Sequence, residues 1–132
     1  MAIKFFKSSE LETNVKATIH SNGRLGFNSN AQKKLKLDSY KFVMIGCEED
    51  RESDEVLYLI PTNDIEIDGF SLSVAGGYYY ANARPLFEKL GTDYETRKVI
   101  YNISELLVDG QIVFKLKKRE LERKSDEVDG EE

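Results

Sequence analysis

The sequence contains few of the residues that form metal centres and covalent cross-links. Its 132 residues include one cysteine, Cys47, and one histidine, His20. A single thiol excludes an intrachain disulfide, and these two side chains cannot complete a four-ligand zinc site. A catalytic cysteine–histidine pair would have to be these two residues. His20 is expected on a strand surface, and Cys47 as a small apolar residue at a strand end. We therefore expect a protein that is not an enzyme and needs no cofactor or metal.

Long hydrophobic segments are also missing. The apolar residues Ile3, Phe5 and Phe6 form too short a run for a signal peptide, and no later run reaches the length that spans a bilayer. We expect a cytoplasmic protein without a membrane partner, in agreement with the shortage of cysteine. No phosphate-binding loop of the GxxxxGK[ST] type is present, and the acidic run at residues 48–55 lacks the spacing and the glycine of a calcium loop.

The net charge of −5 conceals an uneven distribution. Acidic residues gather in residues 48–55 and 125–132, and the remainder of the chain carries more basic than acidic residues. The simple interpretation is that both acidic runs are solvated and maintain solubility. The sharper one is a basic face from which the acidic segments are turned away. Residues 119–132 form a charged tail, whose acidic end is expected to be disordered.

The first half of the chain predicts a strand–strand–helix–strand–strand unit. After an N-terminal arm of residues 1–14, alternating residues predict a half-buried strand over 15–20 with Val15, Ala17 and Ile19 inward. The Asn22-Gly23 pair predicts a hairpin turn into a return strand over 24–27. A helix over 31–37 follows, capped by Asn28, Ser29 or Asn30 and buried through Ala31 and Leu35. Strands over 41–47 and 56–60 complete the unit, 15–61, and Pro61 is expected to end the last one.

The same order returns in a second unit, 70–118, after a connection of residues 62–69. Its elements are a strand over 70–74, a Gly76-Gly77 turn, a return strand over 78–81, a helix capped by Asn82, and strands over 97–103 and 111–115 joined by Asp109-Gly110. Leu86 and Leu90 are expected to be buried in the same way as Ala31 and Leu35. Residues 116–124 are expected either to extend the last strand or to form a short basic helix. A tandem repeat is indicated. One unit cannot bury its apolar faces alone, so we predict a mainly β fold with two short helices, in which the two units form one pseudo-symmetric barrel.

The first unit resembles the swapped-hairpin superfamily of AbrB-, SpoVT- and MazE-like proteins. The resemblance lies in residues 18–27, in the short helix and its Lys34-Leu35-Lys36-Leu37 step, and in the strands over 41–46 and 56–61. Lys89-Leu90-Gly91 resembles the same step, and two copies in one chain resemble the MraZ arrangement. The resemblance covers about residues 15–118. The chain departs from the family at Asn28 and Asn82, where a proline commonly precedes the helix.

This resemblance implies a DNA-binding transcription regulator that uses basic residues of paired hairpins. Carried over to this chain, it selects Arg24, with Lys16 and His20 on the outward face of the first strand beside Thr18. The basic helix adds further phosphate-binding candidates: Lys33, Lys34 and Lys36. The second hairpin carries no basic residue, and Arg84 is the nearest cation. The first hairpin is therefore expected to be the reading half.

Tyr78 and Tyr80 leave other functions open. They could stack on the bases of a single-stranded nucleic acid beside Arg84. They could instead form a protein-interaction or antitoxin-like surface, or a site of self-association, since tyrosine is enriched at interfaces. The simplest interpretation is that at least one face of this tyrosine-rich strand is core or subunit interface.

Overall fold

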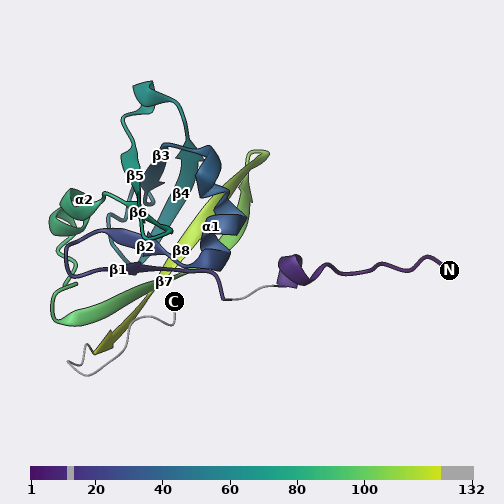
Figure 1. Ribbon diagram of the computed structural model, residues 1–132, viewed down its shortest axis with the longest axis horizontal. Coiled ribbons are helices and arrows are strands. Elements are labelled where there is room, and N and C mark those ends of the chain that lie inside the picture. The colour runs from purple at the N-terminus through teal and green to yellow at the C-terminus, as the bar shows by residue number, and fades with distance from the viewer. Residues whose placement is uncertain (12–13, 123–132) are drawn as a thin grey trace.

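The computed structural model describes residues 1–11 and 14–122. Within them, eight antiparallel strands close into a barrel with the order β1-β2-β6-β5-β3-β4-β8-β7 (Figure 1). The strands are β1 (Lys16–Ile19), β2 (Leu25–Phe27), β3 (Phe42–Gly46), β4 (Val56–Thr62), β5 (Phe70–Ala75), β6 (Tyr78–Ala81), β7 (Arg97–Val108) and β8 (Gln111–Glu122). The helices are α1 (Ser29–Leu35) and α2 (Arg84–Lys89), with short 3-10 turns η1 (Ser8–Leu11), η2 (Leu37–Ser39) and η3 (Ile65–Ile67). The prediction of a mainly β barrel with two short helices is confirmed.

The two copies are interleaved around the barrel. β1 of the first copy pairs with β7 of the second, and β5 of the second pairs with β3 of the first. The remaining contacts between copies join equivalent strands, β2 with β6 and β4 with β8. The equivalent strands of the two copies are β1 and β5, β2 and β6, β3 and β7, and β4 and β8. Exchanging each strand with its equivalent leaves the order around the barrel unchanged, so the arrangement is pseudo-twofold. Neither copy therefore possesses a complete sheet of its own.

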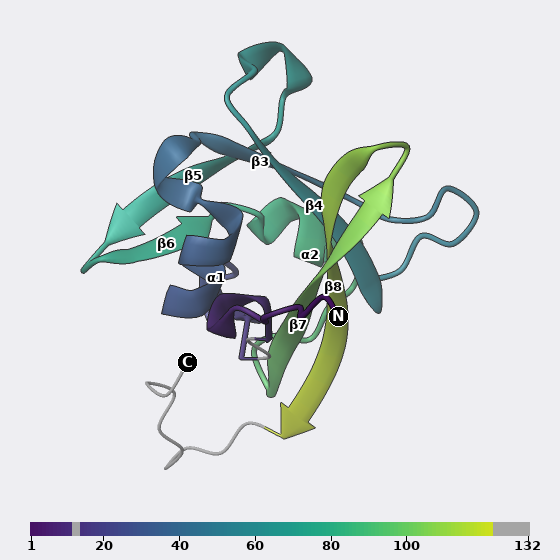
Figure 2. The same ribbon diagram turned by 90° about the vertical axis from the view of Figure 1, so that its right-hand side faces the viewer.

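The barrel core is filled by the residues that alternation predicts. Val15, Ala17 and Ile19 are fully buried, as are Leu25 and Phe27 on the return strand. Both helices add to this core from different sides of the barrel (Figures 1 and 2). α1 contributes the predicted residues, Ala31 and Leu35. None of the described helices is both long and apolar enough to cross a membrane.

The two helices begin differently, which corrects one prediction. Asn28 caps α1 as expected, because its side chain accepts a hydrogen bond of 2.9 Å from the Ala31 N–H. Asn82 does not cap α2, where Ala83 occupies the capping position without a side-chain bond. The Asn82 amide is used across the sheet instead, donating to the hydroxyls of Ser71 and Ser73 at 2.8 Å each.

The buried side of α2 also differs from the prediction. Leu86 and Leu90 are only half-buried, whereas Ala83 and Phe87 are completely buried. Phe87 lies against Tyr101 of β7 with ring centroids 6.3 Å apart. One large ring in a six-residue helix thus fills the space that two leucines were expected to share.

The strands of the later hairpins extend further than the sequence indicates. Pro61 lies inside β4, opposite Val43, rather than ending the strand. β8 pairs with β4 only over Val56–Leu59, so Pro61 lies beyond that pairing, where its missing N–H breaks no bond to β8. Residues 116–122 extend β8 as one of the two alternatives proposed, and the acidic end of the tail lies outside the described residues.

Candidate nucleic-acid interface

Pairing of β2 with β6 brings the two predicted hairpins side by side. Leu25 lies opposite Ala81 and both are completely buried. Since neighbouring residues of a strand point to opposite faces, the next pair, Gly26 and Tyr80, points outward. The outer face of this part of the barrel is therefore built from both copies, not from the first alone.

Three side chains meet on this face, namely His20, Arg24 and Tyr80, and Arg84 lies against the turn at Gly23; we call these four residues the hairpin-junction cluster. The Arg24 guanidinium carbon lies 5.8 Å from the centre of the Tyr80 ring, within the range of a cation–π contact. The His20 ring meets the same tyrosine edge-on, with centroids 5.3 Å apart and planes inclined by 69°. Two DNA-binding candidates of the first hairpin, Arg24 and His20, thus contact a tyrosine of the second.

Two glycines form the floor of this cluster. A Cβ atom added to Gly26 would lie 2.5 Å from Nε2 of His20 and 3.0 Å from Cε1 of Tyr80. A Cβ added to Gly23 would lie 2.5 Å from Cγ of Arg84. Gly23 also has a φ of +89°, a conformation that residues with a Cβ rarely adopt. A side chain at either position would therefore displace the groups that lie over it, and at Gly23 it would also strain the backbone.

Arg84 adds a cation from the start of α2. Its Nε donates to the Glu88 carboxylate at 2.9 Å, one helical turn further along. This hydrogen bond, with the neighbouring Tyr94 and the charge of Glu88, raises the pKa of Arg84 above its ordinary value. Arg84 is exposed, so an anionic ligand would have to compete with Glu88 for its guanidinium group.

The remaining predicted residues of the first unit are not equally available. Lys16 and His20 are half-buried, but Thr18 between them is only 4% exposed and offers little to a ligand. On α1, Lys34 is paired with Glu105 of β7 at 3.4 Å. Lys33 and Lys36 are exposed.

Of the two tyrosines singled out from the sequence, Tyr78 is the accessible one. Tyr78 is 49% exposed, whereas Tyr80 is half-buried beneath Arg24 and His20. A stacking role on this face would fall to Tyr78, with Tyr80 serving to position Arg24 and His20.

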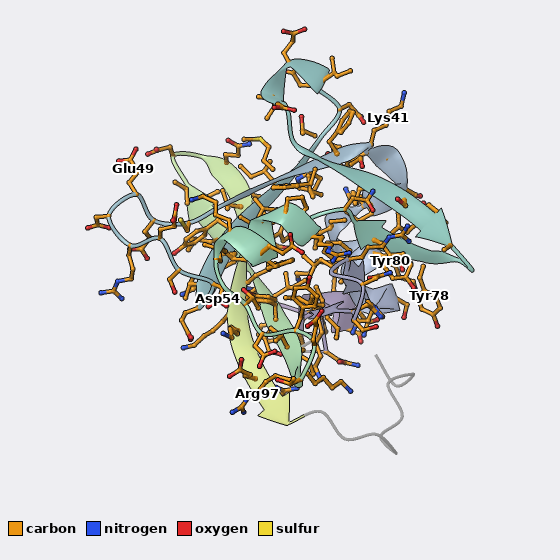
Figure 3. All side chains as sticks on the ribbon, turned by 90° about the vertical axis from the view of Figure 1, so that its left-hand side faces the viewer. Lys41, Glu49, Asp54, Tyr78, Tyr80 and Arg97 are labelled. Carbon is orange, nitrogen blue, oxygen red and sulfur yellow. The ribbon has the colours of Figure 1, made fainter. Side chains whose placement is uncertain are left out.

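The acidic loop lies on a different side of the molecule. Figure 3 shows Glu49 and Asp54 on the side of the barrel opposite Tyr78 and Tyr80. The loop is not purely solvated, because the Asp54 carboxylate accepts hydrogen bonds from the Thr92 hydroxyl at 2.6 Å and from Lys118 at 3.0 Å. Its end is therefore a structural link to the second copy.

Two side chains that bond to Asp54, Tyr101 and Lys118, have shifted pKa values. The Tyr101 hydroxyl donates to the Asp54 carbonyl at 2.7 Å, and burial, followed by the charge of Asp54, raises the pKa of Tyr101 far above its usual range. Burial alone would lower the pKa of Lys118, but the hydrogen bond and charge of Asp54, with Glu120 and Glu55, raise it.

The single cysteine and the single histidine have different surroundings. The described residues contain no group of three or more histidine, cysteine or acidic side chains able to hold a metal ion. Cys47 is half-buried and packs against the hydrophobic core, whereas the His20 ring lies on the outer face against Tyr80.

Sequence reasoning missed the contact between copies that organises this face. Gly26 was the available signal, because a glycine inside a strand often marks the close approach of another group. The partner of that close approach depends on the β2–β6 register, which no local pattern encodes.

Comparisons with family models, with curated proteins and with solved structures found no match to this chain.

Proposed function

We propose that the protein binds DNA through the outer face of its paired hairpins, as a regulator of the swapped-hairpin type without catalytic activity. The observation that carries this proposal is the hairpin-junction cluster, in which Arg24 contacts Tyr80 of the other copy, and Arg84 of that copy lies against Gly23, the residue before Arg24. The strand order, in which the copies alternate, supports the same proposal, since the family that the first unit resembles uses paired hairpins.

The electrostatic layout favours an anionic partner on this face. Arg24, His20 and Lys16 come from adjacent strands β1 and β2 or the turn between them. The most acidic loop is on the other side of the barrel (Figure 3). Phosphate contacts fix a protein on a duplex and provide most of its salt-dependent affinity. We therefore assign Arg24 and Lys16 to phosphate binding, with Arg84 joining when phosphate displaces Glu88.

Tyr80 has a positioning role in this scheme. Its ring makes a cation–π contact with the Arg24 guanidinium and an edge-on contact with the His20 imidazole. Because both side chains are already restrained, each would lose less conformational entropy on binding. On the basic helix, Lys34 is paired with Glu105, so the exposed Lys33 and Lys36 are its better phosphate-binding candidates.

A fluorescence-anisotropy titration against duplex and single-stranded DNA at several salt concentrations tests the proposal. Each phosphate contact contributes about −0.9 to the log–log salt slope on duplex DNA, so Arg24→Gln should weaken binding and reduce the slope by about 0.9. Lys41→Gln is the matched control, since Lys41 is exposed and lies away from Tyr78 and Tyr80 (Figure 3).

Three results would contradict the proposal. Absence of binding to either form of DNA would refute it outright. Equal losses in the Arg24 variant and its Lys41 control would place binding elsewhere. A preference for single strands that Tyr78→Ala abolishes would replace duplex recognition by base stacking on the exposed tyrosine.

A further inference from the structure

The N-terminal arm carries apolar side chains that the barrel does not cover. Residues 1–11 extend away from the barrel on the side of α1 (Figure 1). Ile3 is 67% exposed, Phe5 83% and Phe6 66%. Two neighbouring aromatic rings and an isoleucine in this state are an exposed apolar patch, and such patches commonly mark interaction sites.

The point at which the arm leaves the barrel is fixed by hydrogen bonds. The Asn14 carbonyl accepts bonds from the side-chain amides of Asn28 at 3.1 Å and Asn30 at 3.0 Å. The next residue, Val15, is fully buried and its carbonyl accepts from the Ile103 N–H at 2.9 Å. The chain is thus held at the start of α1, while residues 1–11 project from the barrel.

A second uncovered apolar surface lies at the end of the longest hairpin. We call Leu106, Leu107, Val108 and Ile112 the hairpin tip, at the turn between β7 and β8. Leu107 is 70% exposed and pairs directly with Ile112, which is 51% exposed. Leu106 and Val108, on the other face of the hairpin, are 39% and 42% exposed. Both faces of the tip are therefore apolar and open.

We propose that the arm of one chain docks on the hairpin tip of a second copy, and that the contact is reciprocal in a twofold dimer. Each chain has one arm and one tip, so a closed pair forms two equivalent contacts and leaves no arm without a tip. This interface uses residues outside the hairpin-junction cluster and does not depend on the function proposed above.

Charge complementarity supports the tip as a receptor of the arm. Lys4 and Lys7 flank the aromatic residues of the arm, and Asp109 and Glu105, which already pairs with Lys34, flank the leucines of the tip. Apolar residues would therefore meet in the middle of the contact, with opposite charges at its borders. This is the usual distribution of an apolar interface centre and a polar rim. Acidic residues also flank the exposed isoleucines of η3, which the control variant below therefore tests as the rival receptor.

The available area is sufficient for a stable dimer. An aromatic side chain buries roughly 150–250 Å² when it is fully covered. Phe5 and Phe6 of two arms, with Ile3 and the matching surface of two tips, therefore reach the total of about 1,200–2,000 Å² that stable interfaces bury.

Sedimentation velocity of the full chain from micromolar to submillimolar concentration tests the dimer. We expect a concentration-dependent dimer that the arm variant Phe5→Ser/Phe6→Ser and the tip variant Leu107→Ser/Ile112→Ser both convert to monomer. The matched control is Ile65→Ser/Ile67→Ser on η3, where the isoleucines are 72% and 43% exposed, and it should leave the dimer intact. Circular dichroism should be unchanged, because all of these side chains lie on the surface. Urea midpoints are compared at a concentration at which the wild-type chain is monomeric, because a dimer would raise the wild-type midpoint by mass action.

Disulfide trapping identifies the contact itself. In a Cys47→Ser background, mixed chains carrying Phe5→Cys and Leu107→Cys should form a cross-chain disulfide under mild oxidation. Phe5→Cys mixed with Ile65→Cys should not. A wild-type chain that sediments as a monomer throughout, or equal trapping at Ile65, would overturn the proposal. So would a disulfide that forms only within one chain carrying both substitutions, because the arm would then cover its own tip.

Discussion

Gly26→Ala is the most informative single substitution in this fold, because it should disturb the hairpin-junction cluster while leaving the backbone intact. The new methyl group would lie 2.5 Å from Nε2 of His20 and 3.0 Å from Cε1 of Tyr80, so both rings must move. The backbone of Gly26 itself can carry a Cβ, since its φ is not positive.

The expected stability change is small because two effects oppose each other. Losing an edge-on aromatic contact costs about 0.5–1.5 kcal/mol. Replacing glycine by alanine stabilises the folded state by about 0.4–1 kcal/mol, because the unfolded chain then loses less conformational entropy on folding. The net change in unfolding free energy should therefore stay within about 1 kcal/mol, which urea denaturation can measure.

The cluster itself can be observed through His20, the only histidine of the protein. Its ring protons experience the ring current of Tyr80, so their NMR shifts report the 5.3 Å contact directly. Gly26→Ala and Tyr80→Leu should move these signals in the same direction, toward the values of an exposed histidine. Unchanged histidine signals in Gly26→Ala, in a folded protein, would refute the packing of His20 over Gly26 and the role given to Tyr80.

Other substitutions test the fold and its polar links. Asn28→Ala removes the α1 cap and the tether to Asn14, and should lower the free energy of unfolding by about 1–2 kcal/mol in urea titrations. Phe87→Ala should lower the free energy of unfolding by about 3–5 kcal/mol, and Leu86→Ala by clearly less, because only Phe87 is fully buried. A larger loss in the Leu86 variant would show that the wrong residue of α2 has been assigned to the core. Lys118→Met should cost about 1–3 kcal/mol at pH 7 through the lost bond to Asp54. Because the folded-state pKa of Lys118 is raised, its contribution is fully present below the ordinary value of about 10.5 and is lost as pH rises through the folded value. The difference between wild type and Lys118→Met should accordingly remain constant from pH 7 to about 10 and shrink at higher pH.

The hairpin turns could be predicted from sequence because their chemistry is local. Gly23, Gly76 and Gly77 all have positive φ values, as does the Asp109-Gly110 turn. Asn28 was recognisable as a helix cap for the same reason, since capping depends on residues three positions apart. Alternation over residues 15–19 identified the buried face of β1 correctly.

Features that depend on distant contacts could not be predicted in this way. α2 has six residues, too few for its apolar spacing to distinguish Phe87 from the leucines beside it. The extension of β8 through Glu122 runs over a stretch rich in lysine, arginine and glutamate, a composition that suits helices as well as strands. The candidate site was identified only in part, because the contact of Arg24 with Tyr80 arises from pairing between the two copies.

The interleaved strand order has a consequence for synthesis on the ribosome. β1 is among the first elements to emerge, but its outer neighbour is β7, and Lys16 finds its partner in Asn102. At about 5–20 residues per second, several seconds pass before that partner has been translated. During this interval the first copy has an unpaired strand edge and an uncovered apolar face. The nascent chain should therefore bind holding chaperones until the second copy emerges, and premature termination between the copies should yield an aggregation-prone product.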